Sequence, residues 1–256
     1  MILTSGISKS FGNVYAVDGL SFEVRKGEVF GLLGPNGAGK TTTIKLILGL
    51  LEKDAGEISV LGRDPTKDAV KIKRRIGYVS EDPLIYKSLT PRELYNFIAS
   101  IRRLNGEQVS KRLKEYLVSL DCLEYYDRLI TTLSHGNKQK VQIIAAFLHD
   151  PEILIMDEPV TGLDAKSMKV VKEMMELHTK RGGAILFSTH IMEVAQELCD
   201  RIGIINKGRM VAMGTMEELR HQADRAGASL EDVFLKLTDA DESVNQIIEN
   251  LRKSMR

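Results

Sequence analysis

The sequence contains no tryptophan, and aromatic residues make up only 5% of its 256 positions. Proteins that bind single-stranded nucleic acid by base stacking need aromatic platforms, and those that bind its backbone need an excess of basic residues. Here 36 Lys and Arg residues face 35 Asp and Glu residues, so the formal net charge is +1. The composition therefore argues against a nucleic-acid-binding protein, and equally against a protein with an acidic tail.

Cysteine and long apolar runs are also scarce. The two cysteines, Cys122 and Cys199, lie far apart and match no metal-binding spacing, so we expect no disulfide framework and a reducing compartment. The best apolar runs, Ile44–Leu51 and Ile153–Met156, are shorter than the roughly 20 residues that cross a bilayer. Residues 1–5 contain no basic stretch that leads into an apolar one, so we expect no signal peptide. These features predict a soluble chain and leave open a role beside a membrane.

The sequence does have a regular alternation of short buried strands with helices, in a length that suits one large domain or two small ones. Strands are predicted over Val29–Leu33, Ile76–Val79, Ile153–Met156, Ala184–Phe187 and Ile202–Ile205. Helices are predicted over Thr41–Leu51, Pro91–Leu104, Glu107–Leu120, Lys138–His149 and Lys166–Arg181. Such an alternation predicts an α/β fold with a mainly parallel sheet.

Three regions depart from this alternation. Short alternating strands at Phe22–Val24 and Glu57–Leu61 predict a small antiparallel β subdomain beside the main sheet. Residues at about 90–150 are mostly helical and predict a helical subdomain inserted in the main domain. Near the end, apolar residues three and four positions apart predict an amphipathic helix. We therefore divide the chain into a domain of residues 1–237 and a tail of residues 238–256.

A glycine-rich motif joins the first buried strand to the helix after it. It fits the pattern G-x-x-x-x-G-K-[ST] with one more threonine behind it, and its residues are Gly34, Pro35, Asn36, Gly37, Ala38, Gly39, Lys40, Thr41 and Thr42. Glycines let backbone amides approach phosphate oxygens, and the start of the helix adds positive potential. Lys40 is predicted to neutralise the β- and γ-phosphates, and Thr41 to offer its hydroxyl to Mg²⁺. The motif predicts binding of a nucleoside triphosphate.

A later apolar strand ends in two carboxylates, Asp157 and Glu158. In a parallel sheet this position brings Asp157 beside the Mg²⁺ and lets Glu158 orient and deprotonate the attacking water. GTP-binding proteins use N-K-x-D to recognise the base, but here Asn206-Lys207-Gly208 is followed by Arg209. Because the aspartate is missing, we reject a GTPase and predict a turn between strands at this segment.

One further segment distinguishes between the classes of nucleotide-binding protein that remain. Its residues are Leu133-Ser134-His135-Gly136-Asn137. With it, the chain resembles the ATP-binding cassette (ABC) family, as the nucleotide-binding subunit of a transporter. The family pattern is L-S-G-G-Q, so His135 and Asn137 depart from it. Ser134 and Gly136, the positions that face a γ-phosphate in this family, are kept. The resemblance covers about residues 1–237 and implies a P-loop NTPase core.

The resemblance also assigns residues outside these motifs. Asp164 matches an aspartate of the subunit interface, and His190 matches the histidine that reaches the γ-phosphate and positions water. Phe11 matches the aromatic residue that stacks on adenine, with Tyr15 as a rival. Glu81 stands where the family usually has a glutamine that links Mg²⁺ to the membrane subunit, and its carboxylate is expected to hold Mg²⁺ or water.

The function that the resemblance implies is an ATPase that drives a separate integral membrane permease from the cytoplasmic face of the membrane. Two copies are expected to pack head-to-tail, so that each ATP lies between Lys40 of one chain and Ser134 of the other. Glu81 and the segment Ser229–Phe234 resemble the branch that pairs with export-type membrane subunits. The alternatives are an importer subunit and a non-transport ABC-type ATPase. DNA-repair members of the latter kind carry a long coiled coil, and no sustained heptad is present here.

Overall fold

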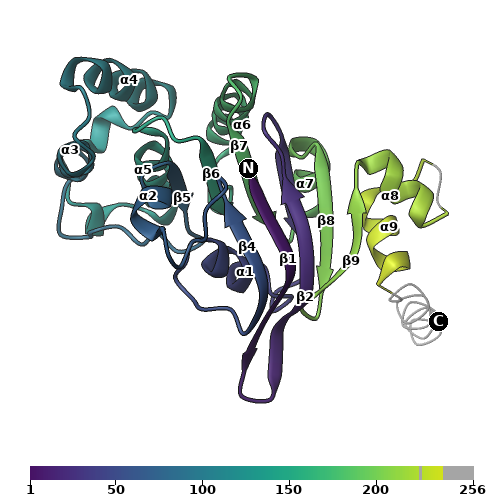
Figure 1. Ribbon diagram of the computed structural model, residues 1–256. Helices are drawn as coiled ribbons and strands as arrows, with labels where there is room; N and C mark the ends of the chain where they lie inside the picture. Colours follow the sequence, from purple (N-terminus) through teal and green to yellow (C-terminus); the bar gives the residue numbers. More distant parts are fainter. Residues whose placement is uncertain (225–226, 239–256) are drawn as a thin grey trace.

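The computed structural model describes residues 1–224 and 227–238 and contains two β-sheets with helices packed around them (Figure 1). The larger sheet has the strand order β5-β6-β7-β3-β8-β9. Its strands are β3 (Val29–Leu33), β5 (Ile76–Val79), β6 (Ile153–Asp157), β7 (Ala184–Thr189), β8 (Arg201–Asn206) and β9 (Arg209–Gly214). All neighbouring strands are parallel except β8 and β9. The predicted α/β fold with a mainly parallel sheet is confirmed.

The smaller sheet is antiparallel, with β1 (Ile2–Phe11) in the centre between β2 (Val14–Val24) and β4 (Ala55–Val60). A small antiparallel sheet is thus confirmed, but its predicted strands at residues 22–24 and 57–61 cover only part of it. The prediction lacks β1 and most of β2. Polar residues such as Thr4, Ser8 and Lys9 interrupt the apolar alternation of β1, and bulges shift its register against both neighbours.

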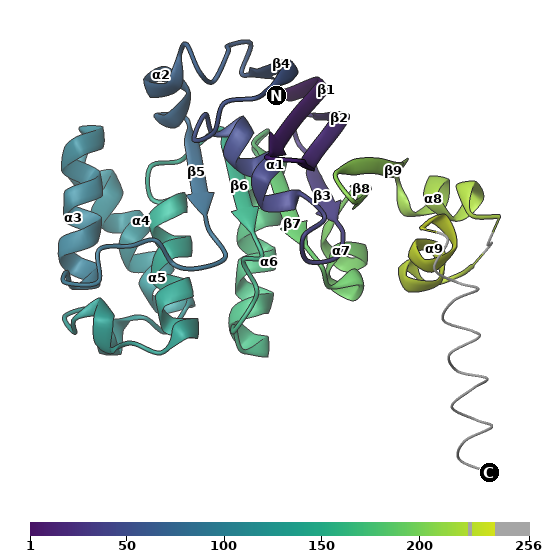
Figure 2. The ribbon, with the colours of Figure 1, turned by 90° about the horizontal axis from the view of Figure 1, so that it is seen from below.

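The helices form layers on both faces of the large sheet. They are α1 (Lys40–Ile47), α2 (Ala69–Lys73), α3 (Pro91–Arg102), α4 (Gly106–Ser119), α5 (His135–Phe147), α6 (Ala165–Lys180), α7 (Met192–Leu198), α8 (Met216–Gln222) and α9 (Leu230–Leu237). Figure 2 shows α1 between the two sheets, α6 and α7 on the opposite face, and α3, α4 and α5 to one side. The latter three occupy the region of the predicted helical subdomain. The predicted tail helix lies outside the described residues.

Two helix boundaries differ from the predicted ones by more than two residues. α1 ends at Ile47, and not at residue 51, because Gly49 adopts a left-handed conformation with φ 62° that stops the helix. α5 begins at His135, and not at residue 138, because the Ser134 hydroxyl accepts a hydrogen bond from the Asn137 amide (3.3 Å) and caps the helix earlier.

The parallel strands decide where the predicted motifs meet. Every residue of β3, β6 and β7 is buried, which explains why these strands are continuous apolar runs. Since β3, β5, β6 and β7 are parallel, the loops that follow them emerge at the same edge of the sheet. Across the described residues, no helix combines the length and the apolarity that crossing a bilayer requires.

Candidate active site

The loop after β3 wraps around the side-chain amine of Lys40. This amine donates hydrogen bonds to the carbonyl oxygens of Gly34 (2.7 Å) and Pro35 (3.3 Å), and the residue is only 6% exposed. Gly39, the N-cap of α1, has a φ of 105°, and an added Cβ would lie 2.3 Å from the Ala16 carbonyl oxygen. Only glycine fits there. The loop thus leads directly into the start of a helix, the geometry that binds phosphate groups.

A cleft of about 480 Å³ lies over this loop. Phe11, at the end of β1, and Ala16 of β2 line it together with Glu81 and Glu158, which follow β5 and β6. The loop and α1 supply the other lining residues: Asn36, Gly37, Gly39, Lys40, Thr41 and Thr42. Phe11 is 53% exposed, so its ring is accessible, and its rival Tyr15 does not line the cleft. The structure therefore brings the predicted base-stacking residue to the predicted phosphate-binding loop.

Glu158 lies at the centre of a buried polar network. Its Oε1 is 2.8 Å from Nδ1 of His190 and 3.6 Å from Nζ of Lys40. The Thr189 hydroxyl donates to its Oε2 (3.2 Å). With a φ of 49°, Glu158 turns the chain immediately after β6, a strained conformation of the kind that clusters at functional sites. The structure thus brings together Lys40, Glu158 and His190, the three residues that the sequence predicts as catalytic.

Asp157 carries one carboxylate oxygen that has a partner and one that has none. The Ser188 hydroxyl, in the neighbouring strand β7, donates to Oδ1. Oδ2 is buried and has no hydrogen-bond partner among the described residues. Burial raises the pKa of nearby Tyr78 to about 12, and the charges of Asp157 and Glu81 act in the same direction. A buried carboxylate oxygen without a partner, in an acidic surrounding, fits a bound cation or its water.

The predicted signature residues lie apart from this cleft. The first turn of α5 has no acidic residue, so the positive end of the helix beside Ser134 is open to an anion. Gly136 packs against the loop before α6, since an added Cβ would lie 2.3 Å from the Gly162 carbonyl oxygen. His135 lines a separate cavity of about 740 Å³ with residues 82–87. Neither Ser134 nor Gly136 is among the lining residues of the Lys40 cleft.

Asp164 is bound within its own chain. Its carboxylate accepts hydrogen bonds from the amide and the hydroxyl of Ser167 (2.8 Å each) and pairs with Nζ of Lys140 (3.0 Å). The bonds from Ser167, and then the one from Lys140, hold the pKa of Asp164 well below its usual range. Asp164 therefore caps α6 and ties it to α5. Its role at a subunit interface stays a prediction.

The sequence model of the family described as ABC transporter matches residues 17–161, more than half of the chain. This chain belongs to the ABC transporter family. It is 41% identical over 238 residues to the linearmycin resistance ATP-binding protein LnrL of Bacillus subtilis, covering 93% of this chain and 75% of that protein. It is 37% identical over 213 residues to the Nod factor export ATP-binding protein I of Burkholderia lata, covering 83% and 70%.

A solved structure described as the ATP-binding subunit of an ABC transporter is 34% identical to this chain, with a TM-score of 0.89. The match covers 93% of this chain and 99% of that one. Together with the family match, it confirms the predicted P-loop NTPase core and the prediction of an ATP-binding and ATP-hydrolysing transporter subunit. The chain is the ATP-binding subunit of an ABC transporter and an ATPase.

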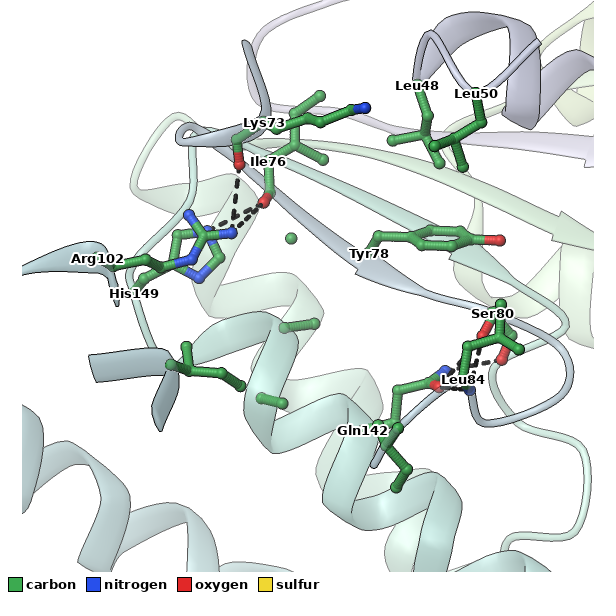
Figure 3. A pocket seen from close by; sticks show the side chains of 15 residues that line it. Leu48, Leu50, Lys73, Ile76, Tyr78, Ser80, Leu84, Arg102, Gln142 and His149 are labelled. Carbon is green, nitrogen blue, oxygen red and sulfur yellow. Dashed lines mark hydrogen bonds between the residues drawn. The ribbon is translucent and has the colours of Figure 1, made fainter. Parts of the chain in front are cut away.

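Three polar residues of this ABC ATPase fix the loops of the site, although the sequence motifs did not predict them. Ser188 and Thr189 fix the two carboxylates, as described above. Gln142 of α5 fixes the loop after β5: its Nε2 donates to the Ser80 carbonyl oxygen (2.7 Å), and its Oε1 accepts from the Leu84 amide (3.1 Å) (Figure 3). The sequence held one signal of these residues, a polar side chain next to apolar ones. Gln142 interrupts an apolar helix segment, and Ser188 and Thr189 stand at the end of an apolar strand.

A third cavity of the ABC ATPase, of about 350 Å³, lies beside the same loop (Figure 3). Its lining is mainly apolar: Leu48, Leu50, Lys73, Ile76, Gly77, Tyr78, Ser80, Leu84, Ile85, Ile98, Arg102, Gln142, Ala145, Ala146 and His149. At one end, the Arg102 guanidinium donates to the carbonyl oxygen of Arg74 (2.9 Å). Burial lowers the pKa of His149 to about 4, so this side chain is neutral at pH 7. Leu84, by contrast, is 80% exposed at the rim.

Proposed function

We propose that this chain powers export, and that it hydrolyses ATP in the Lys40 cleft with Glu158 as the general base. The observation that carries the proposal is the contact network of Glu158, which lies within 4 Å of both Lys40 and His190. One relative is named for linearmycin resistance and another for Nod factor export, and both names support export as the direction of transport. The departures at Glu81, His135 and Asn137 leave this network intact.

Each residue of the cleft has a part in the proposed reaction. Phe11 stacks on the base, and the loop amides with Lys40 bind the phosphates. Glu158 takes the proton of the attacking water, Thr189 holds its carboxylate, and His190 positions the water at the γ-phosphate. The Thr41 hydroxyl, Oδ2 of Asp157 and the Glu81 carboxylate would hold Mg²⁺. That ion, when bound, draws negative charge from the phosphate oxygens.

We also propose that two copies form a head-to-tail dimer. Support comes from the separation of the two anion-binding features, because Ser134 and Gly136 do not line the cleft that contains Lys40. A second chain in the opposite orientation would bring its Ser134 hydroxyl and the start of its α5 to the γ-phosphate. ATP then closes the interface, and hydrolysis with phosphate release reopens it.

Mixing two inactive variants tests this arrangement. Lys40→Met removes the phosphate-binding amine, and Ser134→Asp puts a negative charge against the γ-phosphate while Asp still caps α5. A mixed head-to-tail dimer contains one intact site, formed by Lys40 of one chain and Ser134 of the other. We expect each variant alone to be nearly inactive and an equal mixture to recover about a quarter of the wild-type phosphate release, because half of the dimers are mixed and each has one working site.

The control for the mixing experiment is the double variant, which carries both substitutions in one chain. Mixed with wild-type protein, it gives dimers whose two sites each lack one component. It should therefore recover nothing beyond the activity of the wild-type dimers. No recovery on mixing the single variants, with dimer formation verified by mass, would mean that Lys40 and Ser134 do not share a nucleotide across the interface.

The integral membrane partner is proposed to dock at the third cavity, the apolar one of about 350 Å³, from the cytoplasmic face. An apolar cavity with exposed rim residues such as Leu84 and Leu50 is the kind of surface to which a helix of another protein binds. The same loop carries Glu81 into the ATP cleft, and Gln142 fixes that loop to α5. Docking there would thus act directly on the nucleotide site.

Leu84→Arg tests the docking surface. We expect it to lower the yield of an integral membrane subunit that co-purifies with the tagged chain by about tenfold or more, as for a central interface residue. Phosphate release by the isolated chain should be unchanged, since the Leu84 side chain does not line the ATP cleft. The control is Leu177→Arg, an exposed leucine on α6 that does not line this cavity. Equal co-purification of the two variants would rule out this surface.

A further inference from the structure

A charged pair lies beside the ring of Phe11, and it does not line the cleft. Nζ of Lys9 lies 5.7 Å from the centroid of this ring, within the range of a cation–π interaction. The same amine is 2.7 Å from Oδ1 of Asp54. Neither Lys9 nor Asp54 belongs to any motif of the ATP site, and neither lines the cleft.

Asp54 fixes the end of β1 by more than this ion pair. Its other oxygen, Oδ2, accepts hydrogen bonds from the amide and the hydroxyl of Ser10 (2.7 Å each). Its own amide donates to the Ser8 carbonyl oxygen (2.8 Å). The three residues before Phe11 are therefore all bound to one aspartate. These bonds also hold the pKa of Asp54 at about 2, with the contact to Lys9 as the largest cause, so the carboxylate stays ionised at neutral pH.

Along the chain, Asp54 connects the helix that follows the phosphate-binding loop to the small sheet that carries Phe11. It lies between α1, which starts with Lys40, and β4, which pairs with β1.

An aromatic ring with a cation near one face has less electron density, and its open face then attracts an electron-rich purine more strongly. Phe11 is half exposed and lines the cleft, so its ring is accessible to a base.

We propose that Lys9 and Asp54 are positioning residues for the nucleobase: Asp54 holds the Lys9 ammonium against the Phe11 ring, and this pair sets the strength of purine stacking on Phe11. The proposal rests on the proposed function, in which Phe11 is the base platform. It adds two residues that act through Phe11 without contact with the nucleotide.

The test compares two ligands, ATP and inorganic triphosphate, by calorimetry with Mg²⁺. Triphosphate reports on the phosphate-binding loop alone, so the ratio of the two Kd values gives the contribution of the adenosine, and a change of this ratio in a variant far from the ribose reports on the base. We expect Lys9→Met to weaken ATP binding about threefold and to leave triphosphate binding unchanged, as for an exposed cation–π contact. Asp54→Asn should act in the same direction, and Lys9→Arg should restore the wild-type ratio. The matched control, Lys53→Met, removes a neighbouring positive charge and should change neither Kd.

Two results would overturn the proposal. One is an ATP Kd in Lys9→Met that equals that of Lys53→Met; the other is an equal loss for ATP and triphosphate, which would mean damage to the fold. Phe11→Ala distinguishes these from a failure of the proposed function. It should lower the base contribution more than Lys9→Met does, and an unchanged ratio in Phe11→Ala would show that Phe11 is not the base platform.

Discussion

Replacing Glu158 by Gln is expected to lower kcat for ATP hydrolysis by about 100-fold or more, while ATP still binds. Glutamine keeps the shape of the side chain and an oxygen for the hydrogen bond from Thr189, but it cannot accept a proton from the attacking water. The change also removes a negative charge 3.6 Å from the amine of Lys40, so the triphosphate meets less repulsion. The ATP-bound dimer should therefore accumulate. Phosphate release, calorimetry with ATP and light scattering measure these three effects.

Two further variants separate a chemical role of Glu158 from a structural one. Glu176→Gln makes the same change at an exposed ion pair on α6 and should leave kcat as in the wild type. His190→Ala should lower kcat by itself, but it should add little in the Glu158→Gln background, because the two residues act through one contact of 2.8 Å. Normal steady-state hydrolysis by Glu158→Gln would refute its assignment as the base.

The sequence was sufficient to locate the ATP site because each of its motifs directly follows a buried strand. Lys40 and His190 come soon after β3 and β7, and Asp157 is the last residue of β6; the apolar runs of these strands are visible without a structure. What the sequence could not supply is the order β5-β6-β7-β3, which makes these strands neighbours. The pairing of Asp157 with Ser188 and of Leu33 with Thr189 then places the ends of β6, β7 and β3 side by side, at the edge where the loops of the site begin. The family resemblance implied a P-loop core, but the strand order and these pairings come from the structure.

The residues that support the site were beyond prediction for a different reason. Gln142 and Ser80 are 62 positions apart, and Asp54 is 45 positions from Lys9, so no local pattern relates the partners. Each such contact depends on how one element packs on another, for example α5 on β5. A polar residue at an apolar helix position, as at Gln142, indicates a buried hydrogen bond but does not identify its partner. Strand β1 was likewise missed, since its stability comes from two neighbouring strands and not from its own alternation.

Replacing Lys40 by Met is expected to weaken ATP binding by about 100-fold, an effect at a different step from that of Glu158→Gln. A buried ammonium makes charge-assisted hydrogen bonds with phosphate oxygens, and two such bonds together account for a loss of about this size. Methionine has a similar length and keeps the apolar contacts of the stem, but it cannot bind the phosphates or the carbonyl oxygens of Gly34 and Pro35. Calorimetric titration with ATP and with inorganic triphosphate measures the loss, which should be equal for both ligands.

Lys45→Met is the matched control, since Lys45 lies on the same helix but is exposed and does not line the cleft. It should bind ATP like the wild type. Thermal unfolding of Lys40→Met without nucleotide detects a second consequence: the buried Glu158 carboxylate loses the Lys40 ammonium 3.6 Å away, so a lower Tm is expected. If Lys40→Met bound ATP as tightly as Lys45→Met does, the loop after β3 would not be the phosphate site. If it lost triphosphate binding but kept its Tm, the amine would serve the ligand alone.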